Sequence, residues 1–136
     1  MIRAVVDTSI EIRAVIEGTV GPILVKLRDA AYTLVYSQTL LDELLEKLAS
    51  PRIRDKYKVD EDAVETLLAL VALRGEIVQP SRKIEVCRDP DDNAILEAAV
   101  DGEAGYIVTG DEDLLVLDGF EGIRVLTPRM FLEMLE

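Results

Sequence analysis

The fold is decided by the stretch Ile2-Arg3-Ala4-Val5-Val6-Asp7, an apolar run that ends on a carboxylate. Such a run is typical of a strand that is buried on both faces of a parallel sheet. Four similar runs follow, and we predict strands at 33–36, 76–78, 106–109 and 123–126. Segments with helical periodicity lie between them, so strands and helices alternate along the chain.

Six segments carry the helical pattern, at 22–30, 38–49, 61–74, 92–101, 111–117 and 128–135. Ser37 and Asp60 are suited to cap the second and third helices, and Gly75 is expected to end the third. The alternation predicts an α/β fold, a three-layer α/β/α sandwich around a central, mostly parallel sheet of four to five strands. The 136 residues, 49% of them hydrophobic, predict a single domain over 1–136.

Absent residue types and motifs exclude several kinds of chemistry. The chain has no histidine, which excludes Ser-His-Asp and Cys-His catalysis and histidine-ligated zinc. Cys87 is the single cysteine, and neither a Walker lysine loop nor a GxGxxG motif occurs. The sequence has no apolar run near ~18 residues and no basic leader, so we expect a soluble, cytoplasmic protein without a membrane segment.

The net charge of −12 comes from 15 basic and 27 acidic residues. It argues against a protein that holds nucleic acid mainly by a positive surface. It does not exclude an enzyme that meets nucleic acid through bound cations. The distribution of the acids therefore decides between these cases.

Acidic residues from three separate segments are expected at one edge of the sheet. Asp7 ends the first strand, and Asp111 and Asp113 follow the strand at 106–109. Asp92 heads the apolar stripe of its helix, so its carboxylate is expected to point toward the core side. Ligands of open parallel sheets bind beyond the carboxyl ends of the strands, so these acids lie where a functional site is expected.

A fourth segment, the helix at 38–49, offers two more acids. Asp42 and Glu43 flank its leucine stripe by roughly 60° on either side, and the helical wheel does not choose between them. Each acid of the set also has a structural explanation, because an Asp N-cap contributes ~1 kcal/mol to a helix. Four converging carboxylates would repel one another, however, and oxygen ligands without His or Cys favour Mg²⁺ or Mn²⁺.

Four motifs resemble, in order, those of PIN domains: Val5-Val6-Asp7-Thr8-Ser9, Leu41-Asp42-Glu43-Leu44, Arg88-Asp89-Pro90-Asp91-Asp92-Asn93 and Val108-Thr109-Gly110-Asp111-Glu112-Asp113-Leu114. The chain is most similar to stand-alone prokaryotic PIN domains described as VapC-like ribonuclease toxins of toxin–antitoxin systems. The resemblance implies a metal-binding quartet, and it selects Glu43 over Asp42; the four residues are Asp7, Glu43, Asp92 and Asp111.

Other residues are assigned by the same resemblance. Asp113 is implied as a further catalytic acid, and Ser9 and Thr109 as supporting residues. Ser9 is expected to orient Asp7 through a hydroxyl hydrogen bond. Glu11 stands where PIN domains more often have an apolar residue.

The resemblance implies a metal-dependent endoribonuclease that is the toxin of a type II toxin–antitoxin pair. One or two Mg²⁺ or Mn²⁺ ions would activate a water that hydrolyses the RNA phosphodiester bond. The implied partners are an RNA substrate, an antitoxin protein and a second copy of the chain in a homodimer. Contacts to RNA are expected from four basic residues after Pro51, namely Arg52, Arg54, Lys56 and Lys58, although such residues are equally typical of a solvated surface.

Two alternatives to a nuclease stay open on the sequence. One is a non-catalytic PIN-like binding module that docks a protein or RNA partner. The other is a phosphoryl-handling domain with Asp7 as nucleophile, and it lacks support because Ser9 replaces the second Asp that such a domain needs. The substitution Asp7→Asn separates a nuclease from a binding module, because only a nuclease has metal-dependent cleavage to lose.

Overall fold

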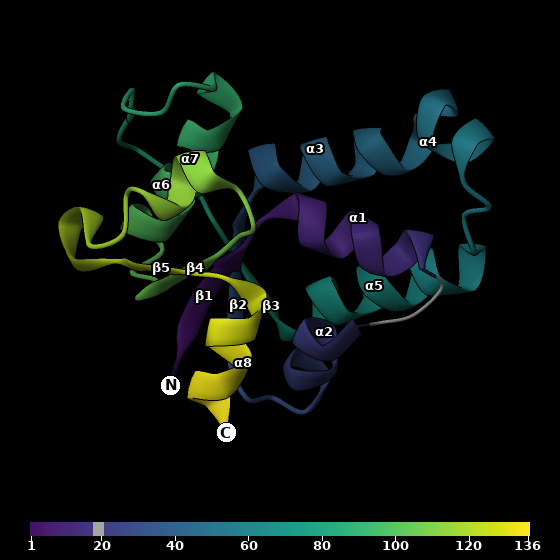
Figure 1. Ribbon diagram of the computed structural model, residues 1–136, viewed down its shortest axis with the longest axis horizontal. Coiled ribbons are helices and arrows are strands. Elements are labelled where there is room, and N and C mark those ends of the chain that lie inside the picture. Colours follow the sequence, from purple (N-terminus) through teal and green to yellow (C-terminus); the bar gives the residue numbers. More distant parts are fainter. Residues whose placement is uncertain (18–20) are drawn as a thin grey trace.

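Five parallel strands form the central sheet of the computed structural model, which describes residues 1–17 and 21–136 (Figure 1). The strands are β1 (Arg3–Val6), β2 (Thr33–Ser37), β3 (Gly75–Val78), β4 (Tyr106–Val108) and β5 (Arg124–Leu126). Their order across the sheet is β3-β2-β1-β4-β5, and every pairing is parallel. The chain order reverses at β1, so the carboxyl ends of β1 and β4 flank the switch point at which such sheets bind ligands.

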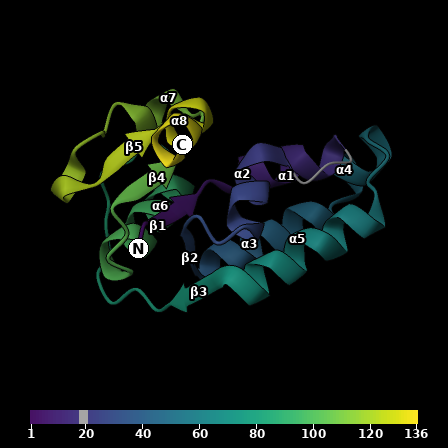
Figure 2. The same ribbon diagram turned by 90° about the horizontal axis from the view of Figure 1, so that it is seen from below.

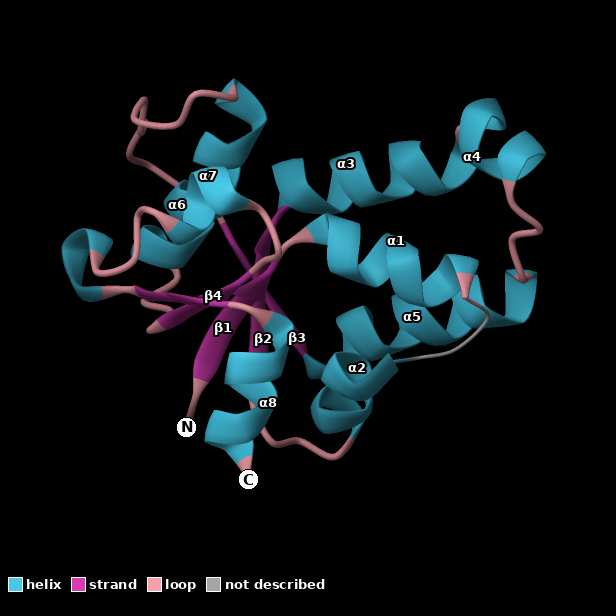
Figure 3. Ribbon diagram, in the orientation of Figure 1, coloured by secondary structure: helices cyan, strands magenta, loops and turns pink. Residues whose placement is uncertain are grey.

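Helices cover both faces of the sheet, as the alternating pattern predicted (Figure 3). The α-helices of the described residues are α1 (Thr8–Ile16), α2 (Gly21–Arg28), α3 (Gln38–Ala49), α4 (Pro51–Lys56), α5 (Glu61–Arg74), α6 (Pro90–Asp101), α7 (Glu112–Leu115) and α8 (Pro128–Leu135). A 3₁₀ turn, η1, spans Phe120–Gly122. None of the helices in the described ranges is long and apolar enough to cross a bilayer.

The strand side chains alternate between two cores. Ala4 and Val6 of β1 pack into the larger core, with residues of α1, α2, α3, α5 and α8. Val5 faces the opposite way and packs with Leu96 and Ala99 of α6 and with Leu114 of α7. This two-residue period explains why the strand runs are apolar throughout, since both faces of the sheet are buried.

The predicted helix ends at Ser37, Asp60 and Gly75 are confirmed. Ser37 Oγ accepts a hydrogen bond from the N–H of Leu40 (3.2 Å), and Asp60 Oδ1 accepts one from the N–H of Asp62 (2.9 Å). At Gly75, α5 passes directly into β3, and a Cβ atom there would lie 2.3 Å from the carbonyl oxygen of Val71. Close approach therefore requires this glycine, whose φ of −95° any residue could adopt.

Two helices, α1 and α4, are absent from the sequence prediction. Helix α1 begins directly after β1 and contains the β-branched residues Ile10, Ile12, Val15 and Ile16, which have below-average helix propensity. Helix α1 packs against α3 and α5, and these three helices extend side by side away from the sheet (Figures 1 and 2). Tertiary packing and a cap from Asp7 therefore stabilise a helix that propensity alone does not predict.

Candidate functional site

Asp7 is the first residue after β1 and is held at both carboxylate oxygens. Its Oδ1 accepts a hydrogen bond from the N–H of Ser9 (3.1 Å), which makes Asp7 the N-cap of α1. Its Oδ2 accepts a hydrogen bond from the hydroxyl of Thr109 (2.8 Å). The side chain is only 9% exposed, so these contacts fix its orientation at the edge of the sheet.

The expected hydrogen bond from the Ser9 hydroxyl to Asp7 is not formed, and the backbone of Ser9 takes that role. As the second residue of α1, Ser9 directs its N–H toward the cap while its side chain points outward and is exposed.

Thr109 connects the acids that follow β1 and β4. Its hydroxyl donates to Asp7 and accepts a hydrogen bond from the N–H of Asp111 (3.0 Å). Asp111 in turn caps α7, because its Oδ1 accepts a hydrogen bond from the N–H of Asp113 (2.9 Å). A fully buried threonine thus sets the positions of two acids that are more than 100 residues apart in sequence.

Asp92 lies beside these acids and is not the cap of its helix. The N-cap of α6 is Asp89, whose Oδ1 accepts a hydrogen bond from the N–H of Asp91 (3.0 Å). Burial, the negative charges of Asp111, Asp89 and Asp7, and a hydrogen bond with Asp111 raise the pKa of Asp92 to about 6. The capping explanation of Asp92 is therefore wrong, and its surroundings are those of a carboxylate without a counter-ion.

Glu43 of α3 approaches the same edge from another direction. Its Oε1 accepts hydrogen bonds from the hydroxyl of Thr8 (3.4 Å) and from Lys47 Nζ (2.7 Å). Asp42, the other acid of this helix, is exposed and accepts a hydrogen bond from Gln38 Nε2 (2.8 Å). Glu43 therefore points toward the start of α1 beside Asp7, whereas Asp42 does not, and Lys47 balances the charge of Glu43.

Asp113 and Cys87 lie near the same group of acids. Burial raises the pKa of the Cys87 thiol, and the charges of Asp92, Asp111, Asp89 and Asp113 raise it further. The segment that carries Cys87 is fixed by Asn93, whose Oδ1 accepts hydrogen bonds from the N–H groups of Val86 (3.2 Å) and Cys87 (2.9 Å).

The acid group has the chemistry of a site for a hard cation, although its side chains do not form a closed ligand set. In residues 1–17 and 21–136, no three Asp, Glu or Cys side chains are arranged so that they could hold a metal ion. The donors are nevertheless all carboxylate oxygens, and the charges of Asp7 and Asp111 both raise the pKa of Asp92. A bound divalent cation would relieve this repulsion, so the residue types fit Mg²⁺ or Mn²⁺.

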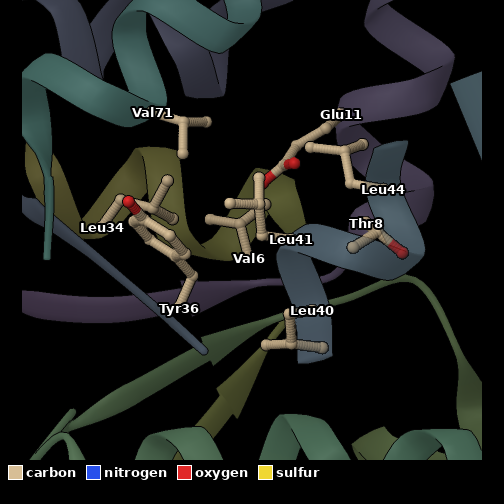
Figure 4. Close-up of a pocket in the computed structure, with 9 residues that line it drawn as sticks. All are labelled: Val6, Thr8, Glu11, Leu34, Tyr36, Leu40, Leu41, Leu44 and Val71. Carbon is tan, nitrogen blue, oxygen red and sulfur yellow. The ribbon is translucent and has the colours of Figure 1, made fainter. Parts of the chain in front are cut away.

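Glu11 is a buried acid whose role the sequence left open. Its carboxyl group points into a small pocket beside Val6, Leu41 and Leu44 (Figure 4). The residue is 4% exposed, and no hydrogen bond or ion pair joins its side chain to the described part of the chain. Burial, with a smaller contribution from the charge of Asp7, raises the pKa of Glu11 to about 8.

The four basic residues expected to contact RNA lie in and after α4, at the far end of α3 from the acids (Figure 1). Arg54 is occupied within the fold, since it donates to the carbonyl of Leu48 (2.9 Å) and pairs with Glu61. Lys56 Nζ lies 5.4 Å from the centre of the Tyr57 ring. Arg52 and Lys58 are exposed.

Three residues that shape the site were not singled out from the sequence: Thr8, Lys47 and Asn93. The spacing of Glu43 and Lys47, four residues apart on one helix, is a signal that could have identified their ion pair. Thr8 and Asn93 each contact another segment of the chain, and no local sequence pattern indicates that these segments lie close together.

Comparisons with known proteins agree with this architecture. The model of the PIN domain family matches residues 3–113. The uncharacterized protein MJ1680 of Methanocaldococcus jannaschii is 32% identical over 145 residues, which cover 99% of this chain and 92% of that protein. The fold is also similar to that of VapBC2 from Rickettsia felis, solved with a DNA fragment from its promoter. That likeness has a TM-score of 0.59 and 17% identity, and it covers 93% of this chain and 98% of the other. On its order of motifs, its parallel sheet and this match, the chain belongs to the PIN domain family.

Proposed function

We propose that this protein is an endoribonuclease that depends on Mg²⁺ or Mn²⁺ and hydrolyses RNA phosphodiester bonds. The observation that carries the proposal is the convergence of Asp7, Asp92 and Asp111 at one edge of the sheet, where their mutual repulsion contributes to the raised pKa of Asp92. A fold keeps like charges together at a sheet edge when a cation or a reaction uses them. Proteins of the PIN domain family are generally nucleases, which supports the same chemistry.

The side chains have distinct roles in this proposal. Asp7, Asp92 and Asp111 would hold the cation, and Glu43 would join them from α3 if its contact with Lys47 were exchanged. When bound, the cation supplies an activated water and neutralises the scissile phosphate. Thr109 fixes the positions of Asp7 and Asp111, and Asp113 or Asp92 would accept the proton of an activated water.

We further propose that the protein acts in the cytoplasm as the toxin of a type II toxin–antitoxin pair and forms a homodimer. The support is the fold similarity to VapBC2 of Rickettsia felis, together with the exposed side chain of Leu73 on α5 as a contact for a second copy. RNA contacts outside the acids are assigned to Arg52, Lys56 and Lys58, with a structural role for Arg54.

The test combines thermal melting with RNA cleavage. The chelator-stripped protein is melted with and without millimolar Mn²⁺ or Mg²⁺, beside Asp92→Asn and the control Asp91→Asn, which replaces the exposed neighbouring acid. Metal at 100 times its Kd would stabilise the folded state by about 2.7 kcal/mol, which raises Tm. We expect this rise, and metal-dependent RNA cleavage, in the wild type and Asp91→Asn but not in Asp92→Asn.

A different outcome would identify the alternative function. If metal leaves Tm unchanged and no RNA is cleaved, while a protein or RNA partner still binds, the chain is a non-catalytic binding module.

A further inference from the structure

A groove follows the surface between α1 and α3, from the acids toward α4. Its volume is about 350 Å³, and its polar lining comes from Ser9 and Arg13 on α1, Glu17 directly after α1, Lys47 on α3 and Tyr57 after α4. Lys47, which lines the groove, is paired with Glu43 (2.7 Å), so the groove begins beside the candidate active site. Tyr57 is the C-cap residue of α4, so the groove ends at the tip of the helical layer (Figures 1 and 2).

Arg13 is an exposed cation that is available to a ligand. Ser9, Arg13 and Glu17 are spaced four residues apart, so they share one exposed face of α1. No hydrogen bond or ion pair joins the guanidinium of Arg13 to the part of the chain that the structure describes. Arg54, by contrast, is bound to Leu48 and Glu61, and Lys47 is bound to Glu43. Arg13 is therefore the groove residue best able to bind a phosphate.

Tyr57 supplies an aromatic surface at the other end of the groove. It is partly buried, which limits its motion, and it is one of the residues that line the groove. Aromatic rings of this kind stack on unpaired bases, whereas bases within a duplex are not free to stack on them.

We infer that this groove is the track of a single strand of RNA, in which Arg13 binds a backbone phosphate and Tyr57 stacks on a base. The inference rests on the proposed function, and it adds the path of the strand and two residues that bind it. Arg13 lies one helical turn, ~6 Å, beyond Ser9, so it meets the strand close to the scissile phosphate. Glu17 lines the same groove and repels a phosphate. Removal of its charge should therefore strengthen RNA binding, whereas removal of the Arg13 charge should weaken it.

The test measures KM and kcat for cleavage of a single-stranded RNA, with the same strand in a duplex for comparison. Arg13→Gln should raise KM roughly 3- to 10-fold, leave kcat unchanged and lower the salt dependence of binding by about one unit. Glu17→Gln should lower KM. Arg28→Gln, on an exposed arginine of α2, is the control and should change neither value.

Tyr57 is tested by two substitutions. Tyr57→Ala should raise KM at least about fivefold, since stacking on one base contributes ~1–3 kcal/mol. Tyr57→Phe keeps the ring and should restore the wild-type KM, which a role of the hydroxyl would not allow. The single strand should bind more tightly than the duplex.

The outcomes separate this inference from the proposed function. If the wild type cleaves RNA and the variants Arg13→Gln and Tyr57→Ala have the same KM as the wild type, the proposed RNA path is wrong and the proposed nuclease activity is retained. If the wild type binds the single strand with the expected dependence on Arg13 and Tyr57 but never cleaves, the track stands and the nuclease fails. Equal affinity for duplex and single strand, or loss of a protein partner instead of RNA in the groove variants, also overturns the inference.

Discussion

The charged side chains at the two edges of the sheet differ in whether they are paired with opposite charges. Near the amino ends of the strands, Arg3 donates to both carboxylate oxygens of Glu76 (2.8 and 3.2 Å) and twice to the carbonyl of Gly102 (3.0 and 2.7 Å). These hydrogen bonds hold the pKa of Glu76 below its usual value. At the carboxyl ends, Asp7, Asp92 and Asp111 meet without an ion pair to any basic residue that the structure describes, and the pKa of Asp92 is raised.

The difference separates residues that stabilise the fold from residues that the fold holds at a cost. Charges at the amino edge are paired, so removing one should destabilise the protein. Charges at the carboxyl edge repel one another, so removing one should stabilise the protein and impair its proposed activity. Stability and activity measurements on matched variants of the two edges therefore test whether the paired and unpaired charges have these opposite effects.

The largest expected effect is on activity at the carboxyl edge. Asp7→Asn keeps the helix cap, because Asn and Asp cap equally well, but it removes a charge from the proposed cation site. We expect RNA cleavage to fall at least about 1,000-fold, which corresponds to ~4 kcal/mol in the barrier. Asp29→Asn, at an exposed acid after α2, is the control, and cleavage assays in Mn²⁺ compare the two. Full activity of Asp7→Asn would show that Asp7 is not part of the proposed cation site.

The next effect concerns Glu11 and depends on pH. The folded-state pKa of about 8 lies above the ordinary value of 4.5, so the unfolded state releases the proton first and stability falls as pH rises from about 4.5 to 8. Glu11→Gln removes this fall and should stabilise the protein at pH 8.5 by roughly 2–4 kcal/mol. Near pH 4 the two proteins should be similar. Urea unfolding at both pH values measures the difference, and parallel pH profiles would show that Glu11 is not buried as a neutral acid.

A smaller effect is expected at the amino edge. Arg3→Met keeps the apolar stem but leaves the carbonyl of Gly102 without two hydrogen bonds from the guanidinium. The half-buried position of Arg3 limits solvent replacement, so we expect a loss of about 1–3 kcal/mol in the free energy of unfolding. Arg129→Met, in an exposed ion pair on α8, should change stability little. Urea unfolding at pH 7 compares these variants, and equal losses would mean that the Arg3 contacts are dispensable.

The smallest effect contrasts Asp92 with Glu76 across the sheet. The raised pKa of Asp92, about 6, makes the metal-free protein less stable as pH rises from about 4 to 6, and Asp92→Asn should remove that loss and raise Tm at pH 7 by ~1–3 °C. The lowered pKa of Glu76 has the opposite sign: its contribution is present above pH 4.5 and disappears as the carboxylate is protonated. Glu76→Gln should therefore lower Tm at pH 7. Shifts of the same sign in both variants would contradict the comparison.

Local sequence predicted the elements whose physics is local. The strands are apolar because both sheet faces are buried, and Ser37 and Asp60 begin helices through contacts within three residues. The order of the acidic motifs also predicted the family and which sheet edge carries the acids. Helix α1 was not predicted, because its β-branched residues have low helix propensity and its stability comes from packing against α3 and α5.

By itself, the sequence determined an α/β chain with acids after its first and fourth strands and neither histidine nor paired cysteine chemistry. The three-dimensional arrangement was needed to show which acids lie close enough for their charges to interact. It placed Thr109 between Asp7 and Asp111, joined Glu43 to Lys47 and Thr8, and buried Glu11 with no side-chain hydrogen bond or ion pair to residues 1–17 and 21–136. The physical reason is that charge, burial and hydrogen bonding depend on distances between segments far apart in the chain. Composition and periodicity describe a single segment and carry no information about those distances.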